Sequence, residues 1–425
     1  MISIKHKFKT WGFLFIALFI ILPACNKEVE QFPESTPVAP PGPSLGETIA
    51  AIPNNSLFYN LIVRSGLLPT INNKATTFTV FVPDNTAMKL FINAASGGLV
   101  PLNAPDAIFS GFISSSLPVS SAAGIVGYNI IPQLLTSAGI PSAFPNFQYA
   151  TILNPAPSLS AFLRLTIFPA SRNGSWVNNI PITGPDVPAA NGVIHPSAFL
   201  VTPPQRYLWD RINTDAGLTY LKAAITRADS GVAATSPVSL IGALNNIGAN
   251  LTVFAPTDAA FQLTLTGAIF QGLTGLPLTP ANAAAHPVEY AQAVALASST
   301  DVFTNPLLFS VLTAQTVKGI AVYHILGNRA FTNNFPTTAT FYPTLLNSAV
   351  PIHPGVSLQA VFGAASAPFA TTATVKGVGN ATASNILIIP APPIPAALIP
   401  EPFGNSDQHY LNGVLHKIDQ VLLPL

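Results

Sequence analysis

The sequence predicts an α+β fold that occurs twice in tandem, and three observations support this prediction. First, a β-prone run followed by a helix start occurs twice, as Thr79–Asp84 and as Thr252–Thr257. Second, an Asn-Gly-Val segment ending in histidine follows in the same order, as Asn191–His195 and as Asn412–His416. Third, apolar residues at helical spacing precede each repeated strand. Helices and strands are partly segregated within each copy, which favours α+β.

The order of these segments predicts where each part of the chain begins and ends. Residues 1–24 are assigned to a signal peptide and residues 25–45 to a modified cysteine with a Pro-rich tether. The first repeat is expected at residues 46–203 and the second at 204–425. The two signatures lie farther apart in the second repeat, so that copy carries large insertions.

Each repeat is predicted to begin with an amphipathic helix and then to enter its first strand. The apolar positions of these helices are Leu57, Phe58, Leu61, Ile62 and Leu67 in the first repeat, and Tyr207, Leu208, Ile212, Leu218, Leu221 and Ile225 in the second. Each strand ends in proline, and Asp84 or Thr257 then supplies a side chain suited to an N-cap. The Asn-Gly pairs predict tight turns, because both residues tolerate positive φ, and terminal strands are expected at 193–201 and 414–423.

Composition limits the classes of function that the chain can serve. Of its 425 residues 49% are hydrophobic and only 8% are charged, whereas a typical soluble domain has about 25% charged residues. After residue 22 there is no apolar run near the ~18 residues that a membrane helix needs. There are 17 basic and 16 acidic residues, a net charge of +1 with no basic stripe. Nucleic acid is therefore excluded as a partner.

The N-terminus predicts export and lipid anchoring. Three lysines precede an apolar stretch, Trp11–Ile21, of signal-peptide length. The stretch ends in Leu22-Pro23-Ala24-Cys25, which resembles the lipobox of bacterial lipoproteins. Cys25 is the single cysteine of the chain, so we expect it to be acylated, with palmitate among its chains, and to anchor the protein without spanning the membrane. The alternatives are a plain secretory signal or an uncleaved anchor.

The expected location is the outer membrane. Charged residues directly after Cys25 loosely resemble the surface-export signals of Bacteroidetes-type lipoproteins, and five prolines between residues 33 and 43 predict an extended tether. We therefore expect an outer-membrane lipoprotein, facing either the cell surface or the periplasm.

Three motifs of the second repeat carry a family resemblance. Residues Thr252–Phe261 resemble the first signature of the fasciclin (FAS1) domain, and Asn412–Pro424 resemble its second signature. Tyr323 and His324 match the Tyr-His pair that lies between the two signatures in this family. The resemblance implies a compact wedge of β-strands packed with helices, found in secreted and membrane-anchored proteins of adhesion or matrix association. It makes Tyr323 and His324 candidate partner-binding residues.

The first repeat keeps both signatures but departs from the family at the Tyr-His pair, where it has Tyr128-Asn129. If the Tyr-His region carries partner contacts in this family, this departure argues against such contacts in the first repeat.

No pattern in the chain predicts catalysis or a metal site. The seven histidines include no pair at metal-ligand spacing. Gly42-Pro43-Ser44-Leu45-Gly46 matches the letters of a nucleophile elbow, but it lies in the tether, where the motif has no strand before it. His195 and His416 are expected to be hydrogen-bonded at the edge of the core. We therefore predict no enzyme, no cofactor and no metal.

The insertions of the second repeat, residues 266–305 and 330–410, allow two interpretations. The first is a packed flap that either lengthens the sheet or covers the core. The second is an aromatic platform for glycans, with Tyr342 and Tyr410 as candidate binding residues. The first functional hypothesis is a non-enzymatic, lipid-anchored envelope protein of adhesion or matrix association, with a cell-surface protein or glycan as partner. The alternative is a carbohydrate-binding module of an outer-membrane polysaccharide-uptake system.

Overall fold

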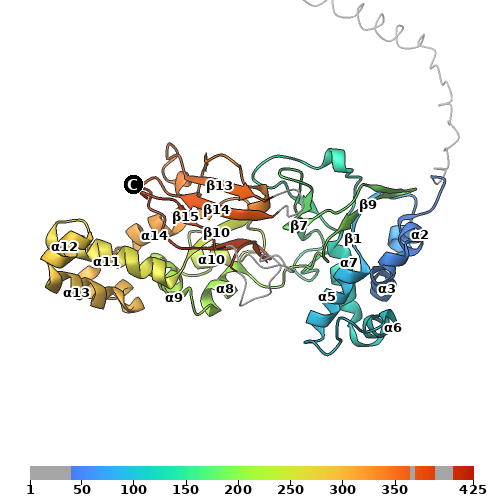
Figure 1. The fold of residues 1–425 in the computed structure, drawn as a ribbon, viewed down its shortest axis with the longest axis horizontal. Helices are drawn as coiled ribbons and strands as arrows, with labels where there is room; N and C mark the ends of the chain where they lie inside the picture. Colours follow the sequence, from blue (N-terminus) through green and yellow to red (C-terminus); the bar gives the residue numbers. More distant parts are fainter. Residues whose placement is uncertain (1–39, 364–368, 388–404) are drawn as a thin grey trace, which may run out of the picture. The chain divides into compact units, whose positions relative to one another are not determined.

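The computed structural model describes residues 40–363, 369–387 and 405–425 (Figure 1). The predicted signal peptide, Cys25 and the tether up to residue 39 lie outside the described residues. The predicted boundary between the repeats, at 203 and 204, falls in a segment without helix or strand.

Both repeats contain a four-stranded sheet with the same order and the same directions. The order is β2-β1-β9-β8 in the first repeat and β11-β10-β17-β16 in the second. In both sheets the inner two strands pair in parallel and the outer strands pair antiparallel. The strands are β1 Phe78–Pro83, β2 Ile130–Ile131, β8 Val187–Ala189, β9 Gly192–Ser197, β10 Leu251–Pro256, β11 Ile325–Leu326, β16 Gln408–Tyr410 and β17 Gly413–Ile418. The predicted α+β class is confirmed, although β9 and β17 end several residues earlier than expected.

Helices cover one face of each of these sheets, and alternate residues of the central strands pack into different cores on the two faces. Along β1, Phe78, Val80 and Val82 belong to the core shared with the helices, whereas Phe81 belongs to the core of the opposite face. The second repeat divides β10 in the same way, with Val253 on the helix side and Phe254 on the other. Alternate residues of a strand point to opposite faces, so a strand buried on both faces is apolar throughout.

The helices that pack on these faces follow the order predicted from the sequence. In the first repeat they are α2 Leu45–Ala50, α3 Ser56–Ser65, α4 Leu68–Asn72, α5 Asn85–Ala95, α6 Asp106–Gly111 and α7 Val119–Tyr128. In the second they are α8 Leu208–Thr214, α9 Thr219–Ala228, α10 Leu240–Leu244, α11 Asp258–Thr274, α12 Pro280–Ala285, α13 Pro287–Ala297 and α14 Ala314–Tyr323. Helix α3 packs on α7, and α9 packs on α14 at the corresponding place.

The predicted caps are confirmed. Asp84 precedes α5 and accepts a hydrogen bond from the backbone N–H of Ala87, and Thr257 precedes α11 and accepts one from Ala260. Caps of this kind contribute about 1 kcal/mol each. Ser44, the serine of the false nucleophile elbow, is the N-cap of α2 and forms a capping box with Glu47.

The two insertions fold differently. Residues 266–305 form the end of α11, helices α12 and α13, and the 3₁₀ turn η4 Thr300–Phe303. The described part of residues 330–410 forms a separate antiparallel sheet with the order β12-β13-β14-β15. Its strands are β12 Thr340–Tyr342, β13 Val356–Phe362, β14 Ala370–Lys376 and β15 Ser384–Asn385. Because its apolar side chains pack with Phe254 and Tyr323, this sheet covers the core, as one form of the first interpretation predicts, and it does not lengthen the sheet of β10.

In the first repeat, two small sheets lie at the corresponding place in the chain. They are β3-β4 and β5-β6-β7, from β3 Tyr149–Ala150, β4 Thr166–Ile167, β5 Pro169–Ala170, β6 Trp176–Val177 and β7 Ile180–Pro181. Their buried side chains pack with Phe81 and Tyr128.

The predicted hairpins are present, but their two-residue loops are Ala190-Asn191 and Leu411-Asn412, because each glycine is the first residue of the following strand. Neither Asn191 nor Asn412 has a positive φ among the described residues. The Asn191 side chain instead accepts a hydrogen bond from Leu45 N–H and donates to the carbonyl of Ile71. The adjacent Gly192 is required because a Cβ there would overlap the carbonyl oxygen of Phe78 on the parallel strand. Asn191 and Gly192 therefore hold the start of β9 against the start of β1 and the first residue of α2.

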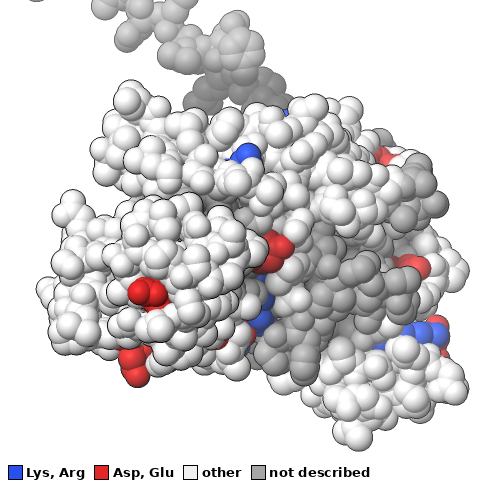
Figure 2. Space-filling model, turned by 60° about the vertical axis from the view of Figure 1, so that its left-hand side comes forward, with Lys and Arg blue, Asp and Glu red and all other residues white. Residues whose placement is uncertain are grey.

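Among the described residues, no single helix is long and apolar enough to cross a membrane. One bent pair, Asp106–Ser116 with Val119–Tyr128, passes by length and composition alone, with a bend of 110°. Charged side chains are few and scattered on the face that Figure 2 shows, in agreement with the composition.

Candidate functional site

The Tyr-His pair lies at the end of α14, inside the protein. The Tyr323 hydroxyl donates to the carbonyl of Gly355 at 2.7 Å and accepts from Val378 N–H at 3.1 Å. His324 donates from Nδ1 to the carbonyl of Ile320 at 2.8 Å and accepts at Nε2 from Leu422 N–H at 2.8 Å. Burial lowers the pKa of His324 to about 4, more than the Ile320 hydrogen bond raises it. The pair holds α14, the inserted sheet and the C-terminal segment together.

The first repeat performs the same task with different chemistry. Tyr128 donates to the carbonyl of Thr166, as Tyr323 does to that of Gly355. Asn129 donates to the carbonyls of Ile125 and Val201, both at 2.8 Å. Val201 occupies the same position after β9 as Leu422 does after β17. At this position Asn129 donates to a backbone carbonyl, whereas His324 accepts from a backbone N–H. In both repeats these two positions are buried, and neither pair presents its polar atoms to solvent.

The repeated histidines also occupy the same place in each repeat. His195 stacks on Phe81 and His416 stacks on Phe254, with ring centroids 5.5 and 5.8 Å apart. Nε2 of His195 donates to the carbonyl of Leu135, and Nε2 of His416 donates to that of Ala330. Both side chains are fully buried, which agrees with the hydrogen-bonded core position expected for them.

An acidic residue nine positions earlier lies beside each of these histidines. Nδ1 lies 3.1 Å from Asp186 Oδ1 in the first repeat and 3.8 Å from Asp407 Oδ1 in the second. In the second repeat, burial lowers the pKa of His416 and outweighs the opposing effect of Asp407. Sequence reasoning missed these aspartates, although their equal spacing from a repeated histidine was a signal that could have found them.

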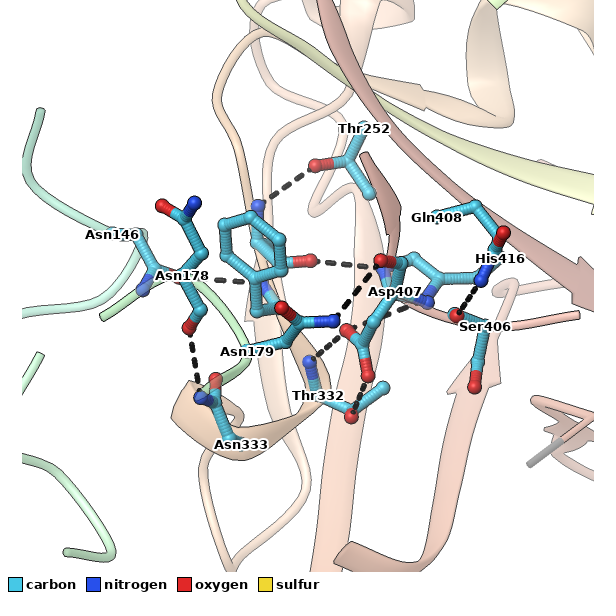
Figure 3. Close-up of polar contacts among 12 residues, drawn as sticks. Asn146, Asn178, Asn179, Thr252, Thr332, Asn333, Ser406, Asp407, Gln408 and His416 are labelled. Carbon is cyan, nitrogen blue, oxygen red and sulfur yellow. Dashed lines mark hydrogen bonds and ion pairs between the residues drawn. The ribbon is translucent and has the colours of Figure 1, made fainter. Parts of the chain in front are cut away.

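A polar network joins the two repeats (Figure 3). The Asn333 amide donates to the carbonyl of Asn178 at 2.9 Å, and Asn146 Oδ1 accepts from Phe331 N–H at 3.2 Å. Asp407 accepts from the backbone N–H and the hydroxyl of Thr332, which holds the second-repeat side of the junction in place. All six residues are buried, so the repeats meet through a dehydrated, specific contact.

Arg329 is the charged centre of this junction. Its side chain is buried, its Nη2 donates to the carbonyl of Leu411 at 2.7 Å, and its Nη1 contacts Nε2 of His409. The guanidinium lies 4.9 Å from the ring centroid of Phe168 in the first repeat, a favourable cation–π distance. Burial lowers the pKa of Arg329 to about 10. Burial, together with the Arg329 charge, holds the pKa of His409 well below its usual value.

The aromatic residues proposed for glycan stacking are used in packing. Tyr342 lies edge-on to Phe144 of the first repeat, with ring centroids 4.5 Å apart, and Tyr410 is only 2% exposed. Phe341, next to Tyr342, is 52% exposed and is the aromatic residue of β12 that faces solvent. Cys25, the predicted lipidation site, lies outside the described residues.

An open cleft lies in the second repeat, along α9. It has a volume of about 680 Å³, within the usual range for small-molecule sites. It is lined by Asn213, Thr214, Asp215, Ala216, Thr219, Lys222, Ala223, Thr226, Arg227, Ser230, Thr300, Asp301, Phe303, Thr304 and Phe309. Most of these side chains carry a hydroxyl, an amide or a charge, so the cleft offers hydrogen-bonding groups beside a larger apolar surface.

Two features fix the charged groups of this cleft. Arg227 donates from Nε to the carbonyl of Leu312 at 3.0 Å, and its guanidinium lies 4.3 Å from the ring centroid of Phe309. Asp215 is paired with Arg211 at 2.8 Å and with Lys417 at 2.7 Å. Burial would raise the pKa of Asp215, but the Lys417 hydrogen bond, the Gly217 N–H and the Arg211 charge together lower it.

No group of three or more potential metal ligands occurs among the residues that the structure describes.

An α+β module repeated in tandem, with its motif residues engaged in the core, is typical of a structural or binding domain. Residues 53–196 match the family model of the fasciclin domain. The match falls on the first repeat, the one that departs from the family's Tyr-His pair. Among solved structures, the chain is similar to a FAS1 domain pair from the insect cell adhesion molecule fasciclin I. That similarity has 15% identity and a TM-score of 0.30, and covers 87% of this chain and 97% of the other. No curated protein matched the sequence.

Proposed function

We propose that this protein is a non-enzymatic, lipid-anchored envelope protein that serves adhesion or association with the extracellular matrix. The observation that carries the proposal is the fasciclin domain at residues 53–196, since such domains belong to adhesion-type extracellular proteins. The basic and apolar leader followed by Cys25 supports export and anchoring. The Tyr-His and Asn-Gly motifs are engaged in core hydrogen bonds, which leaves the outer surfaces of the repeats to contact a partner.

Protease treatment of intact cells, followed by immunoblotting for residues 41–425, tests the proposed location. We expect the protein to be digested on intact cells. A Cys25→Ala variant is expected to appear in the medium or the periplasm, because it has no thiol to acylate. Digestion only after the outer membrane is opened would rule out adhesion to other cells.

The buried junction changes how the two repeats contribute to adhesion. Repeats joined by a flexible linker gain affinity through effective concentration, and the gain depends on the linker length. Here the repeats belong to one compact unit with hydrogen bonds between them. We propose that they present their surfaces at a fixed spacing, so that a partner with two sites at another spacing binds no better than one with a single site.

The second candidate function is carbohydrate capture, and the cleft along α9 favours it. Its lining of hydroxyls and amides resembles the hydrogen-bonding surface that a sugar requires. A glycan array probed with the soluble chain, from residue 26 onward, tests this candidate. Tyr342→Ala and Tyr410→Ala are expected to change folding stability rather than glycan binding, since both rings are packed. A specific loss of glycan binding in folded Tyr342→Ala protein would restore the aromatic-platform hypothesis.

A further inference from the structure

We propose that the cleft along α9 binds a carboxylate-bearing sugar, such as a uronic acid, of an extracellular polysaccharide. This inference deepens the proposed matrix association, because it names the class of ligand and the residues that recognise it. It rests on that function for its biological setting, whereas binding itself is measurable on the purified protein.

The cleft concentrates charge in a chain that has very little. Four of its fifteen lining residues are charged, against 8% of the whole sequence. Seven others carry a hydroxyl or an amide. Four charged side chains therefore meet at one concave place in a chain in which charged residues are few. A polar ligand with at least one ionised group accounts for this distribution.

The net charge of the cleft is positive. Asp215 is neutralised by two cations, Arg211 and Lys417, that lie within 2.8 Å of it. The charges that remain on the lining are Lys222 and Arg227 on α9 and Asp301 on the facing turn η4. Two cations against one carboxylate suit a ligand with a single negative charge. The same Asp301 disfavours a doubly charged phosphate and offers acceptors for sugar hydroxyls.

Comparison with the first repeat shows what is particular to Arg227. Arg64 is its counterpart in the last turn of α3, and Leu117 precedes α7 as Leu312 precedes α14. Arg64 donates from both Nε and Nη2 to the carbonyl of Leu117, at 3.0 Å each. Arg227 donates only from Nε to that of Leu312 and stacks on Phe309 instead.

As a result, Arg227 keeps donors for a ligand. Among the described residues, no hydrogen bond engages its Nη1 or Nη2 atoms. The guanidinium is nevertheless held in place by the Leu312 carbonyl and the Phe309 ring, so little side-chain freedom is lost on binding. A planar fork of this kind pairs with a carboxylate through two parallel hydrogen bonds. Lys222, which precedes Arg227 on the same helix, supplies a second cation to the lining.

Isothermal titration of the soluble chain, from residue 26 onward, with polygalacturonate oligosaccharides tests the proposal. The methyl-esterified oligosaccharide, which keeps the hydroxyls but has no charge, serves as the ligand control. We expect saturable binding of the acid form and at least about ten-fold weaker binding of the ester, as expected for loss of a charge-assisted hydrogen bond. Arg227→Gln is expected to weaken binding about ten-fold or more, and Lys222→Gln by less.

Arg64→Gln is the matched control variant, because it removes the same helix contact from the first repeat and leaves the cleft intact. It is expected to bind like the original chain, and thermal unfolding of both variants shows whether each is folded. Equal binding by Arg227→Gln and the original chain, or equal binding of acid and ester, would overturn the proposal. Absence of binding to any uronate would also overturn it and leave the proposed adhesion standing if the cells still attach through this protein. If the cells do not attach through this protein but the purified protein still binds uronate, the proposed adhesion is overturned and the uronate site stands.

Discussion

At the scale of single residues, the histidine of the Tyr-His pair links helix α14 to the C-terminal segment by two hydrogen bonds. His324 bonds to the carbonyl of Ile320 and to the N–H of Leu422, and it is 2% exposed. His324→Ala leaves both backbone groups without a partner inside the protein, so we expect the free energy of unfolding to fall by about 2–4 kcal/mol. His324→Asn, which introduces the residue of the first repeat, should cost less. Urea denaturation measures both changes.

The control for this prediction is His286→Ala. His286 has 39% of its side chain exposed, so its replacement should change the unfolding free energy by less than about 0.5 kcal/mol. Equal stability of the original chain and His324→Ala would show that the two hydrogen bonds of His324 contribute nothing to the free energy of unfolding.

The same buried histidines predict loss of stability in acid. Burial lowers the pKa of His324 to about 4 and lowers those of His409 and His416 as well. The unfolded chain binds protons at these groups from about pH 6.5 downward, whereas the folded protein does not. Their stabilising contribution is therefore complete above pH 6.5 and is lost as the pH falls from 6.5 toward 4.

Melting temperature measured between pH 7.5 and pH 4 checks this expectation. We expect it to fall steadily below pH 6.5, with a shallower fall in His324→Asn because one protonating group has been removed. A constant melting temperature over this range would mean that these histidines are accessible and protonated in the folded state.

At the scale of elements, the glycine of each Asn-Gly pair is fixed by the neighbouring strand. A Cβ at Gly192 would overlap the carbonyl oxygen of Phe78, and one at Gly413 would crowd that of Leu251. Gly192→Ala is therefore expected to cost several kcal/mol, since it forces apart the central parallel pair. Gly267→Ala is the control, because Gly267 lies inside α11 with open space around its Cα. That change should stabilise by up to about 1 kcal/mol. Thermal unfolding of both variants separates the two effects, and equal stability would contradict the close approach.

Elements that depend on local interactions could be predicted from the sequence, whereas elements that depend on long-range contacts could not. Local chemistry located β1, β10 and the caps Asp84 and Thr257, because a cap acts on the N–H groups three residues away. The inserted sheet β12–β15 was not predicted, since its strands pair with one another and cover a core set by Phe254. Long-range partners also explain the misread Asn-Gly pair: Leu45 and Phe78 lie more than 100 residues before it.

The candidate site was harder to predict than the fold. The motifs drew attention to Tyr323, His324 and Tyr410, because repeated or aromatic residues stand out in a sequence. All three are buried. The cleft instead combines α9 with a turn about 75 residues later, and its side chains are ordinary surface types. Only the fold brings Lys222, Arg227 and Asp301 to one place.

At the scale of the whole molecule, the junction determines whether the two repeats unfold together. Arg329 of the second repeat is buried against Phe168 of the first and contacts His409. Removing one partner of a buried charged contact typically costs about 3–5 kcal/mol. Because this contact lies between the repeats, Arg329→Ala is expected to weaken the free energy that couples their unfolding more than it lowers the stability of either repeat by itself.

Differential scanning calorimetry tests this last prediction. The original chain should unfold in one cooperative transition, because breaking the junction exposes groups of both repeats at once. Arg329→Ala should unfold in two transitions, the lower one at a reduced temperature. Arg164→Ala, which removes an exposed arginine bonded to nearby carbonyls of its own loop, should leave the single transition unchanged. A single transition at the original temperature in Arg329→Ala would show that the asparagine hydrogen bonds between Asn146, Asn178 and the second repeat suffice to couple the two folds.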